Sequence, residues 1–362
     1  MLPKNFSRLA ERLMRCPAAP YCEDRVRAEV KQICLDHALA CRQDKFGNLL
    51  IRLRTAPRQR PLVLAAHMDH PGFQIKRRLG PNRWLARFQG GVPHAYFRRG
   101  LRVRLMPGAA AARLGARVAG PQEFELHGKG SAPTAPEFAV WEMEDFELRG
   151  ELIHGRACDD LIGVAAILAT LIDLKRARRK VHVIGVISRA EEVGFHGALA
   201  VGASRELPRS SMIVSLETSR ELPPVKMGQG VILRVGDRSS IFDSAGTRFL
   251  AEAAGGLKTG SGKFPFQRAL MSGGTCEATA YQELGFQCAA VCVALGNYHN
   301  CAPGGRIAAE FVSLADAIGM VRLLVEAARQ MPSYEKLVAR LPARLEALLK
   351  EARRRLIDPR RV

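Results

Sequence analysis

Five separate stretches of the chain offer a carboxylate or an imidazole that could bind a metal ion, and four of them directly follow a short apolar run. One bridging carboxylate can hold two adjacent divalent ions, each of which also takes one imidazole and one further carboxylate. Imidazole and carboxylate ligands with open positions are typical of catalytic rather than structural zinc. The residues that supply this count are His67, Asp159, Glu192, Glu217 and His299.

Two further acidic residues stand beside these candidate ligands. Paired metal ions lower the pKa of a bridging water and polarise a carbonyl oxygen. Glu191, next to a ligand but not needed as one, could take the proton from that water and pass it to a leaving amine. Asp69 lies two residues after His67 and could orient its imidazole. The pattern therefore predicts hydrolysis of an amide bond by a bridging hydroxide with a glutamate as general base.

The apolar runs that precede the candidate ligands are about one strand long and rich in Val, Ile, Leu and Ala, which is typical of buried parallel strands. In open α/β sheets the functional site lies outside the carboxyl ends of the strands, and the polar residues come just past those ends. Each motif alone has a plainer explanation, since Asp159 and Asp160 would also cap a following helix. Five together favour a metal site. The runs cover residues 61–66, 181–187, 212–216 and 288–295.

The alternation of helices and strands is interrupted once. From about residue 74 to residue 153 there are only short alternating runs separated by Gly and Pro, which predicts a small all-β module inserted into the main domain. We therefore expect a main domain of residues 1–73 and 154–332, an insertion of residues 74–153, and a C-terminal extension of residues 333–362. Helices are predicted at residues 8–14, 25–37, 161–174, 196–204, 243–254, 275–284 and 308–331.

The composition fits a globular protein with a sizeable core. The chain has 362 residues, of which 47% are apolar, enough for one large α/β domain and a smaller one. The longest uncharged apolar stretch, residues 161–172, is too short to span a bilayer. The first residues lack a secretory signal, and nine cysteines without a paired CxxC suggest reduced thiols. We expect a cytoplasmic protein without a membrane partner.

The chain is strongly basic, with 55 Lys and Arg against 35 Asp and Glu and a formal charge of +20. No nucleic-acid-binding motif accompanies this charge, so scattered surface residues explain it better than a nucleic-acid surface. Basic residues do concentrate at residues 333–362, where leucines recur at helical spacing. This spacing predicts an amphipathic helix that packs on its own chain or on a partner subunit.

With these motifs, the chain resembles the glutamyl-aminopeptidase family of dimetal peptidases, which includes the tetrahedral (TET) and deblocking aminopeptidases. The matching motifs run nearly end to end. They are Asp44-Lys-Phe-Gly-Asn48, Ala66-His-Met-Asp69, Asp159-Asp160-Leu-Ile-Gly163, Glu191-Glu192-Val-Gly194, Ser272-Gly-Gly-Thr275 and Tyr298-His299.

The resemblance implies a doubly wound, mixed-sheet α/β catalytic domain with an inserted small β-barrel. It implies that Asp159 bridges two divalent ions, zinc or else cobalt or manganese. His67 and Glu217 would hold one ion, Glu192 and His299 the other, and Glu191 would be the general base. It further implies short peptide substrates and a homo-oligomer formed through the inserted domain.

Four departures from the family pattern concern substrate choice more than metal binding. Glu217 stands where the family has Asp, Leu161 where it has Arg, and His70 where it has Glu. Thr275-Cys276-Glu277-Ala278 stands where the family has Thr-Asp-Ala. Two alternatives to an aminopeptidase stay open. One is a related dimetal carboxypeptidase or deacylase, in which a glutamate at position 217 would be at home. The other is a binding protein that retains metal without catalysis.

Overall fold

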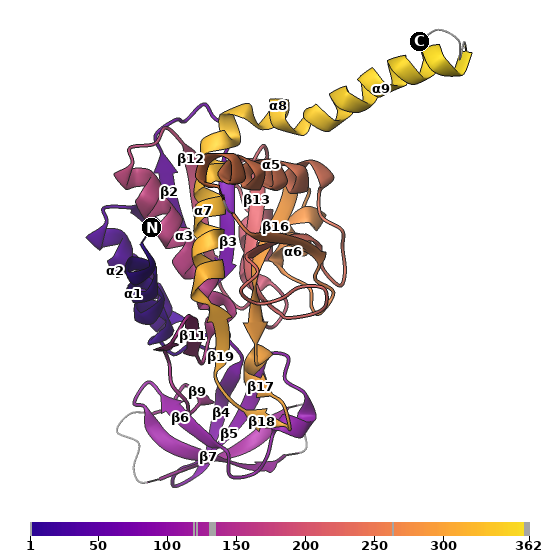
Figure 1. Ribbon diagram of the computed structural model, residues 1–362. Helices are drawn as coiled ribbons and strands as arrows, with labels where there is room; N and C mark the ends of the chain where they lie inside the picture. The colour runs from indigo at the N-terminus through magenta and orange to yellow at the C-terminus, as the bar shows by residue number, and fades with distance from the viewer. Residues whose placement is uncertain (1, 119, 121, 130–134, 263, 358–362) are drawn as a thin grey trace.

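The computed structural model describes residues 2–118, 120, 122–129, 135–262 and 264–357, and it contains a large mixed sheet between helices and a closed β-barrel (Figure 1). The sheet has 11 strands in the order β1-β2-β12-β3-β13-β16-β19-β11-β10, and β14 joins β16 and carries β15. The strands of this sheet are β1 Ala40–Gln43, β2 Leu49–Arg54, β3 Leu62–His67, β10 Glu147–Arg149, β11 Leu152–Gly155, β12 His182–Ser188, β13 Met212–Arg220, β14 Val231–Gly236, β15 Phe266–Leu270, β16 Gln287–Gly296 and β19 Glu310–Ser313.

The centre of the sheet is parallel. Strands β12, β3, β13 and β16 are neighbours in that order and all run in the same direction. Their residues are almost entirely buried, because helices cover both faces. As a result the carboxyl ends of all four strands meet at one edge of the sheet.

Successive residues of each central strand serve two separate cores. In β3, Leu62, Leu64 and Ala66 belong to the core that also contains buried residues of α1, α3, α5 and α7, whereas Val63 and Ala65 belong to the core that contains buried residues of α4 and α6. This alternation makes the domain doubly wound. The helices are α1 Pro3–Met14, α2 Asp24–Asp36, α3 Cys158–Arg176, α4 His196–Ala203, α5 Ser244–Ser261, α6 Glu277–Glu283 and α7 Leu314–Gln330.

The barrel closes in the order β4-β5-β8-β7-β6-β9. Its interior is aromatic: Phe73 and Phe88 meet edge to face at 4.9 Å between ring centroids, and Phe73 meets Trp141 in the same way at 4.9 Å. Short strands β17 Cys301–Ala302 and β18 Arg306–Ile307 reach down to the barrel from the main domain (Figure 1). The barrel strands are β4 Gly72–Gly80, β5 Arg83–Gln89, β6 Arg102–Met106, β7 Ala110–Arg117, β8 Glu123–Gly128 and β9 Phe138–Trp141.

The α/β fold with an inserted barrel is confirmed, but some elements differ from the prediction. Residues 310–313, placed in a long helix by their periodicity, form strand β19, because they pair with β11 and β16. Strands β14 and β15 were missed. Strand β10 and the first two residues of β11 fall inside the range 74–153 assigned to the insertion, yet β10 pairs with β11 and β11 pairs with β19 of the large sheet.

The chain ends in two helices at the opposite end of the molecule from the barrel. Helix α8, Tyr334–Val338, packs on α5, and α9, Arg340–Ile357, extends away from the body (Figure 1). In the part of the chain that the structure describes, no helix combines the length and the apolar character needed to cross a bilayer.

Candidate metal centre

The five predicted ligands converge at the carboxyl edge of the parallel strands. His67 is the last residue of β3, and Glu192 lies in the loop that follows β12. Glu217 lies within β13, which runs on to Arg220 instead of ending at residue 216, because it pairs with β16 as far as Leu295. The other two ligands are Asp159 at the start of α3 and His299 in the turn after β16.

Asp159 lies between the two imidazoles. Its Oδ1 atom is 3.5 Å from Nε2 of His67, and its Oδ2 atom is 3.7 Å from Nε2 of His299. Nε2 of His299 is also 3.2 Å from Oε1 of Glu192. The carboxylate therefore presents one oxygen to each imidazole, which is the arrangement that a bridging ligand requires.

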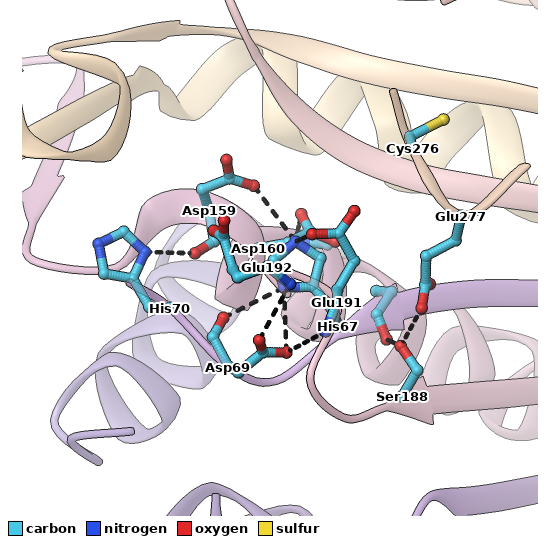
Figure 2. A network of polar contacts seen from close by, with 12 residues as sticks. His67, Asp69, His70, Asp159, Asp160, Ser188, Glu191, Glu192, Cys276 and Glu277 are labelled. Carbon is cyan, nitrogen blue, oxygen red and sulfur yellow. Dashed lines mark hydrogen bonds and ion pairs between the residues drawn. The ribbon is translucent and has the colours of Figure 1, made fainter. Parts of the chain in front are cut away.

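The ligand atoms form two groups, within each of which all atoms lie within 4.8 Å of one another. Glu191, expected as general base, belongs to the first group, with Oε2 at 4.0 Å from Nε2 of His67. Figure 2 shows His67, Asp159, Glu191 and Glu192 directed toward one another. The groups are His67, Glu191 and Glu217, and Asp159, Glu192 and His299.

Buried oxygen atoms without a hydrogen-bond partner indicate that this cluster fits metal ions. They include Oδ1 of Asp159, Oε1 of Glu192 and Oε1 of Glu217. A buried carboxylate oxygen without a partner is costly, and a divalent cation would satisfy all three. The donor set of carboxylates and imidazoles is the one that catalytic zinc takes.

The electrostatics of the cluster agree with this fit. Burial, together with the neighbouring Asp159, raises the pKa of Glu217 to about 8. Burial opposes protonation of His299, but Glu192 and Asp159 outweigh it and raise the pKa of this imidazole to about 9. Both shifts favour the protonated forms of Glu217 and His299. Bound cations would instead favour the deprotonated forms, which are the forms that bind metal ions.

Asp69 positions the loop that carries the two glutamates. Its Oδ1 atom accepts a hydrogen bond from the Glu191 amide at 3.0 Å, and its Oδ2 atom accepts one from the Glu192 amide at 3.2 Å. Nδ1 of His67 is 3.1 Å from the main-chain carbonyl of Asp69, and 3.6 Å from its carboxylate. Asp69 therefore orients His67 through its main-chain carbonyl, while its side-chain carboxylate holds the loop that carries Glu191 and Glu192 (Figure 2).

Two buried residues from the N-terminal segment hold the same loop from the other side. The Ala190 amide donates to Glu23, and Ala190 has a positive φ of 50°, which is unfavourable for alanine. Asn48 accepts a hydrogen bond from the Arg189 amide at 3.1 Å and is itself held by Asp44 at 2.8 Å. The Asp44-Lys-Phe-Gly-Asn48 motif therefore contributes to the site through loop geometry.

Glu310 was missed by sequence reasoning, and it connects two candidate ligands. Its Oε2 atom accepts the Asp159 amide at 3.0 Å, and its Oε1 atom accepts the His299 amide at 2.8 Å. His299 and Asn300 have positive φ angles of 53° and 63°, so this turn needs support. A single carboxylate between apolar residues gives no sequence signal, and the periodicity of residues 308–331 predicts one continuous helix.

We expect Glu310→Gln to weaken ion binding by Asp159, Glu192 and His299 about 10- to 100-fold, the usual effect of altering a partner that orients a ligand. A glutamine has one carbonyl oxygen and can accept only one of the two amides. Zinc titration of the metal-free variant by calorimetry measures the change. Asp316→Asn is the matched control, because Asp316 accepts the Gly228 and Gly230 amides and none of these three residues lines the cleft. Equal loss of affinity in both variants would contradict the role of Glu310.

The departures from the family pattern lie around the cluster. His70 is buried, with Nδ1 at 2.8 Å from the Asp159 carbonyl and Nε2 at 3.0 Å from Oδ1 of Asn300. Glu277 lies beside the cluster and accepts a hydrogen bond from Ser188 (Figure 2). Cys276 is buried and burial raises its pKa, which argues against a nucleophilic thiolate.

A cleft opens over the cluster. The segment 273–275, where the chain departs from the family motif, forms part of its wall, as do Arg220 and Arg234. Arg220 is exposed and stacks over Tyr298 at 5.2 Å from the ring centroid, whereas Arg234 is buried and donates to Ser219. Apart from the candidate ligands and Glu191, the residues lining the cleft include no carboxylate among the described residues.

The sequence profile of the M42 glutamyl aminopeptidases matches residues 135–313, which include all of the predicted ligands except His67. The chain belongs to this family. It is accordingly a hydrolase of the aminopeptidase class. A search of the curated proteins found no match.

Solved structures of aminopeptidases share the fold of this M42 member. A TET aminopeptidase from a marine sediment Thaumarchaeota archaeon is 19% identical with a TM-score of 0.77, and the alignment covers 92% of this chain and 99% of that one. The TET1 peptidase of Pyrococcus horikoshii, described as assembling into a tetrahedron or a large octahedral shell, is 22% identical with a TM-score of 0.74. That alignment covers 89% of this chain and 99% of the other.

Proposed function

We propose that the chain is a two-metal aminopeptidase that removes N-terminal residues from short peptides. The observation that carries the proposal is the position of Asp159, with one carboxylate oxygen toward His67 and the other toward His299. His67 and Glu217 would hold one ion, Glu192 and His299 the other, and Asp159 both. Zinc suits this donor set, with cobalt or manganese as alternatives.

When bound, two such ions would polarise the scissile carbonyl and lower the pKa of a water molecule. The chain itself supplies the proton transfer. Burial, with the nearby acidic groups, raises the pKa of Glu191, and its Oε2 atom faces the cluster. This carboxylate would take a proton from the water and deliver it to the leaving amine nitrogen. Asp69 fixes it by holding the Glu191 amide.

The enzyme class is tested with one peptide sequence in three forms: free at both ends, acetylated at the N-terminus, and amidated at the C-terminus. Metal-stripped protein is refilled with zinc, cobalt or manganese before the assay. We expect metal-dependent release from the free and amidated forms and none from the acetylated form. Cleavage of the acetylated form would favour a carboxypeptidase or deacylase, and inactivity with every metal would favour a metal-retaining binding protein.

The charge of the cleft supports a preference for acidic N-terminal residues. Arg220 is exposed at the cleft, and its guanidinium could pair with a substrate carboxylate. We expect Arg220→Ala to lower kcat/KM for a peptide beginning with Glu by roughly 3- to 10-fold relative to one beginning with Leu, a modest effect because the site is open to solvent. Arg268→Ala, an exposed arginine outside the cleft lining, should leave the ratio unchanged. An unaltered ratio in Arg220→Ala would contradict this preference.

We further propose that copies of the chain associate through the inserted barrel. The similar Pyrococcus horikoshii protein is described as a tetrahedron or an octahedral shell, and another TET1 structure as a dodecamer. These assemblies are properties of those proteins, and they support a homo-oligomer here. A variant whose barrel surface is altered so that copies cannot associate there should sediment as a smaller species than the wild type.

A further inference from the structure

Helix α9 presents an apolar stripe that the described chain does not cover. It extends away from the body beyond Arg340, which pairs with Glu252 of α5 (Figure 1). Leu345 and Leu348 are 55% and 49% exposed. The alignments with the two solved structures above cover 99% of each of those chains but only 89–92% of this one. This chain therefore has segments beyond the shared fold. The stripe also includes Leu341, Leu349 and Leu356.

The stripe follows a heptad repeat. Leu345 and Ala352 stand at a positions, and Leu341 and Leu348 stand at d positions, with the spacing of four, three and four residues that a two-helix contact needs. Leu349 at position e widens the stripe. A helix with such a seam buries it by packing against another helix.

The two charges that flank the seam are of opposite sign. Arg344 and Glu351 occupy consecutive g positions. In an antiparallel pair of identical helices, a residues face d residues of the partner, and g residues face g residues. The register that sets Leu345 against Leu348 of the second copy also sets Arg344 against Glu351, twice by symmetry. A parallel pair would set these charges against Leu349 and Leu356 instead.

Most of the remaining charges of α9 fall outside this seam. Arg355 is the exception, because it stands at the d position that follows Leu348, beyond the layers that residues 341–352 form. Lys350, Arg353 and Arg354 fall at positions f, b and c. These three residues remain in solvent in an antiparallel pair, so their charges do not oppose pairing at the seam. Glu351 also pairs with Arg355 of its own helix, with Oε1 of Glu351 at 2.9 Å from the guanidinium.

We infer that α9 pairs in antiparallel fashion with α9 of a second copy of this chain. The contact is isologous, which suits a two-fold axis. At about 1.5 Å per residue, 18 residues give a seam of only about 27 Å, so the pair is a small interface that acts together with other contacts. Since α9 and the barrel lie at opposite ends of the molecule, pairing here would join units that the barrel forms (Figure 1). The inference does not depend on the proposed function.

Charge exchange in the full-length protein tests this pairing by sedimentation velocity. Arg344→Glu alone and Glu351→Arg alone each place like charges across the seam, and we expect the assembly to fall to at most about half its mass. The double variant should restore the wild-type mass, and so should an equimolar mixture of the two single variants, in which every facing pair is again of opposite sign. Peptidase activity per chain reports intact folding.

The outcomes separate this pairing from other partners of α9. Wild-type mass in both single variants, or no recovery in the mixture, would overturn the inference. Leu345→Glu is an independent variant and should lower the mass as well. Binding of the wild type to phosphatidylglycerol vesicles that Leu345→Glu abolishes, without any change in mass, would instead assign α9 to a lipid surface and overturn the inference.

Discussion

Glu191→Gln is expected to lower kcat by roughly 10²- to 10⁴-fold, the usual contribution of a general base, while the two-ion stoichiometry is retained. The amide cannot take the proton from water. His67, Glu217, Asp159, Glu192 and His299 remain in place as candidate ligands. Turnover of a free peptide and zinc content of the same sample give both quantities.

Glu277→Gln is the matched control for this prediction. Glu277 is buried, and burial raises its pKa to about 7, so an amide approximates its protonated form. Its Oε1 atom bonds to Ser188, and the residue does not line the cleft. We expect kcat within about 10-fold of wild type, since the change leaves the proton-transfer group intact. Near-wild-type turnover in Glu191→Gln would remove Glu191 from the role of general base.

Asp159→Asn is expected to abolish tight binding of both ions. Among the residues that the structure describes, this carboxylate is the one that lies near both imidazoles, at 3.5 Å from Nε2 of His67 and 3.7 Å from Nε2 of His299. Altering a residue that merely orients a ligand costs 10- to 100-fold in affinity, so loss of a shared ligand should cost more than about 100-fold for each ion. Zinc content after dialysis measures this loss directly.

The thermal midpoint of the same variant provides a second reading. An ion that binds only the native state raises the unfolding midpoint. Zinc should therefore raise Tm in the wild type and in Asp316→Asn, but not in Asp159→Asn. Loss of one ion with full retention of the other would show that Asp159 is a ligand of a single site and would contradict the bridging arrangement.

Much of the site could be predicted because its ligands follow strands. The runs that end near His67, Glu192 and His299 are predominantly apolar, and such runs form central parallel strands whose carboxyl ends meet. The convergence of these residues therefore followed from secondary structure alone. In the residue pattern the barrel was visible only as an interruption between residues 74 and 153. Its closure, which only the family resemblance implied, depends on long-range pairing that no local pattern specifies.

The residues that support the ligands were harder to predict. Glu310 and Glu23 act by accepting main-chain amides of distant loops, and this depends on tertiary structure rather than on spacing. Residues 310–313 are too few to show a strand period, and the adjoining helix α7 dominates the periodicity. Strand β15 is only partly buried, so it lacks the apolar run that marked the other strands.

Zinc titration of the metal-free protein, followed by release of the N-terminal residue from a free peptide, tests the central claim most directly. We predict that activity rises and reaches a plateau at two ions per chain, while the acetylated peptide stays intact throughout. A plateau at one ion per chain would contradict the two-metal centre. Full loading with two ions without hydrolysis of the free peptide, or with cleavage of the acetylated one, would contradict the aminopeptidase mechanism.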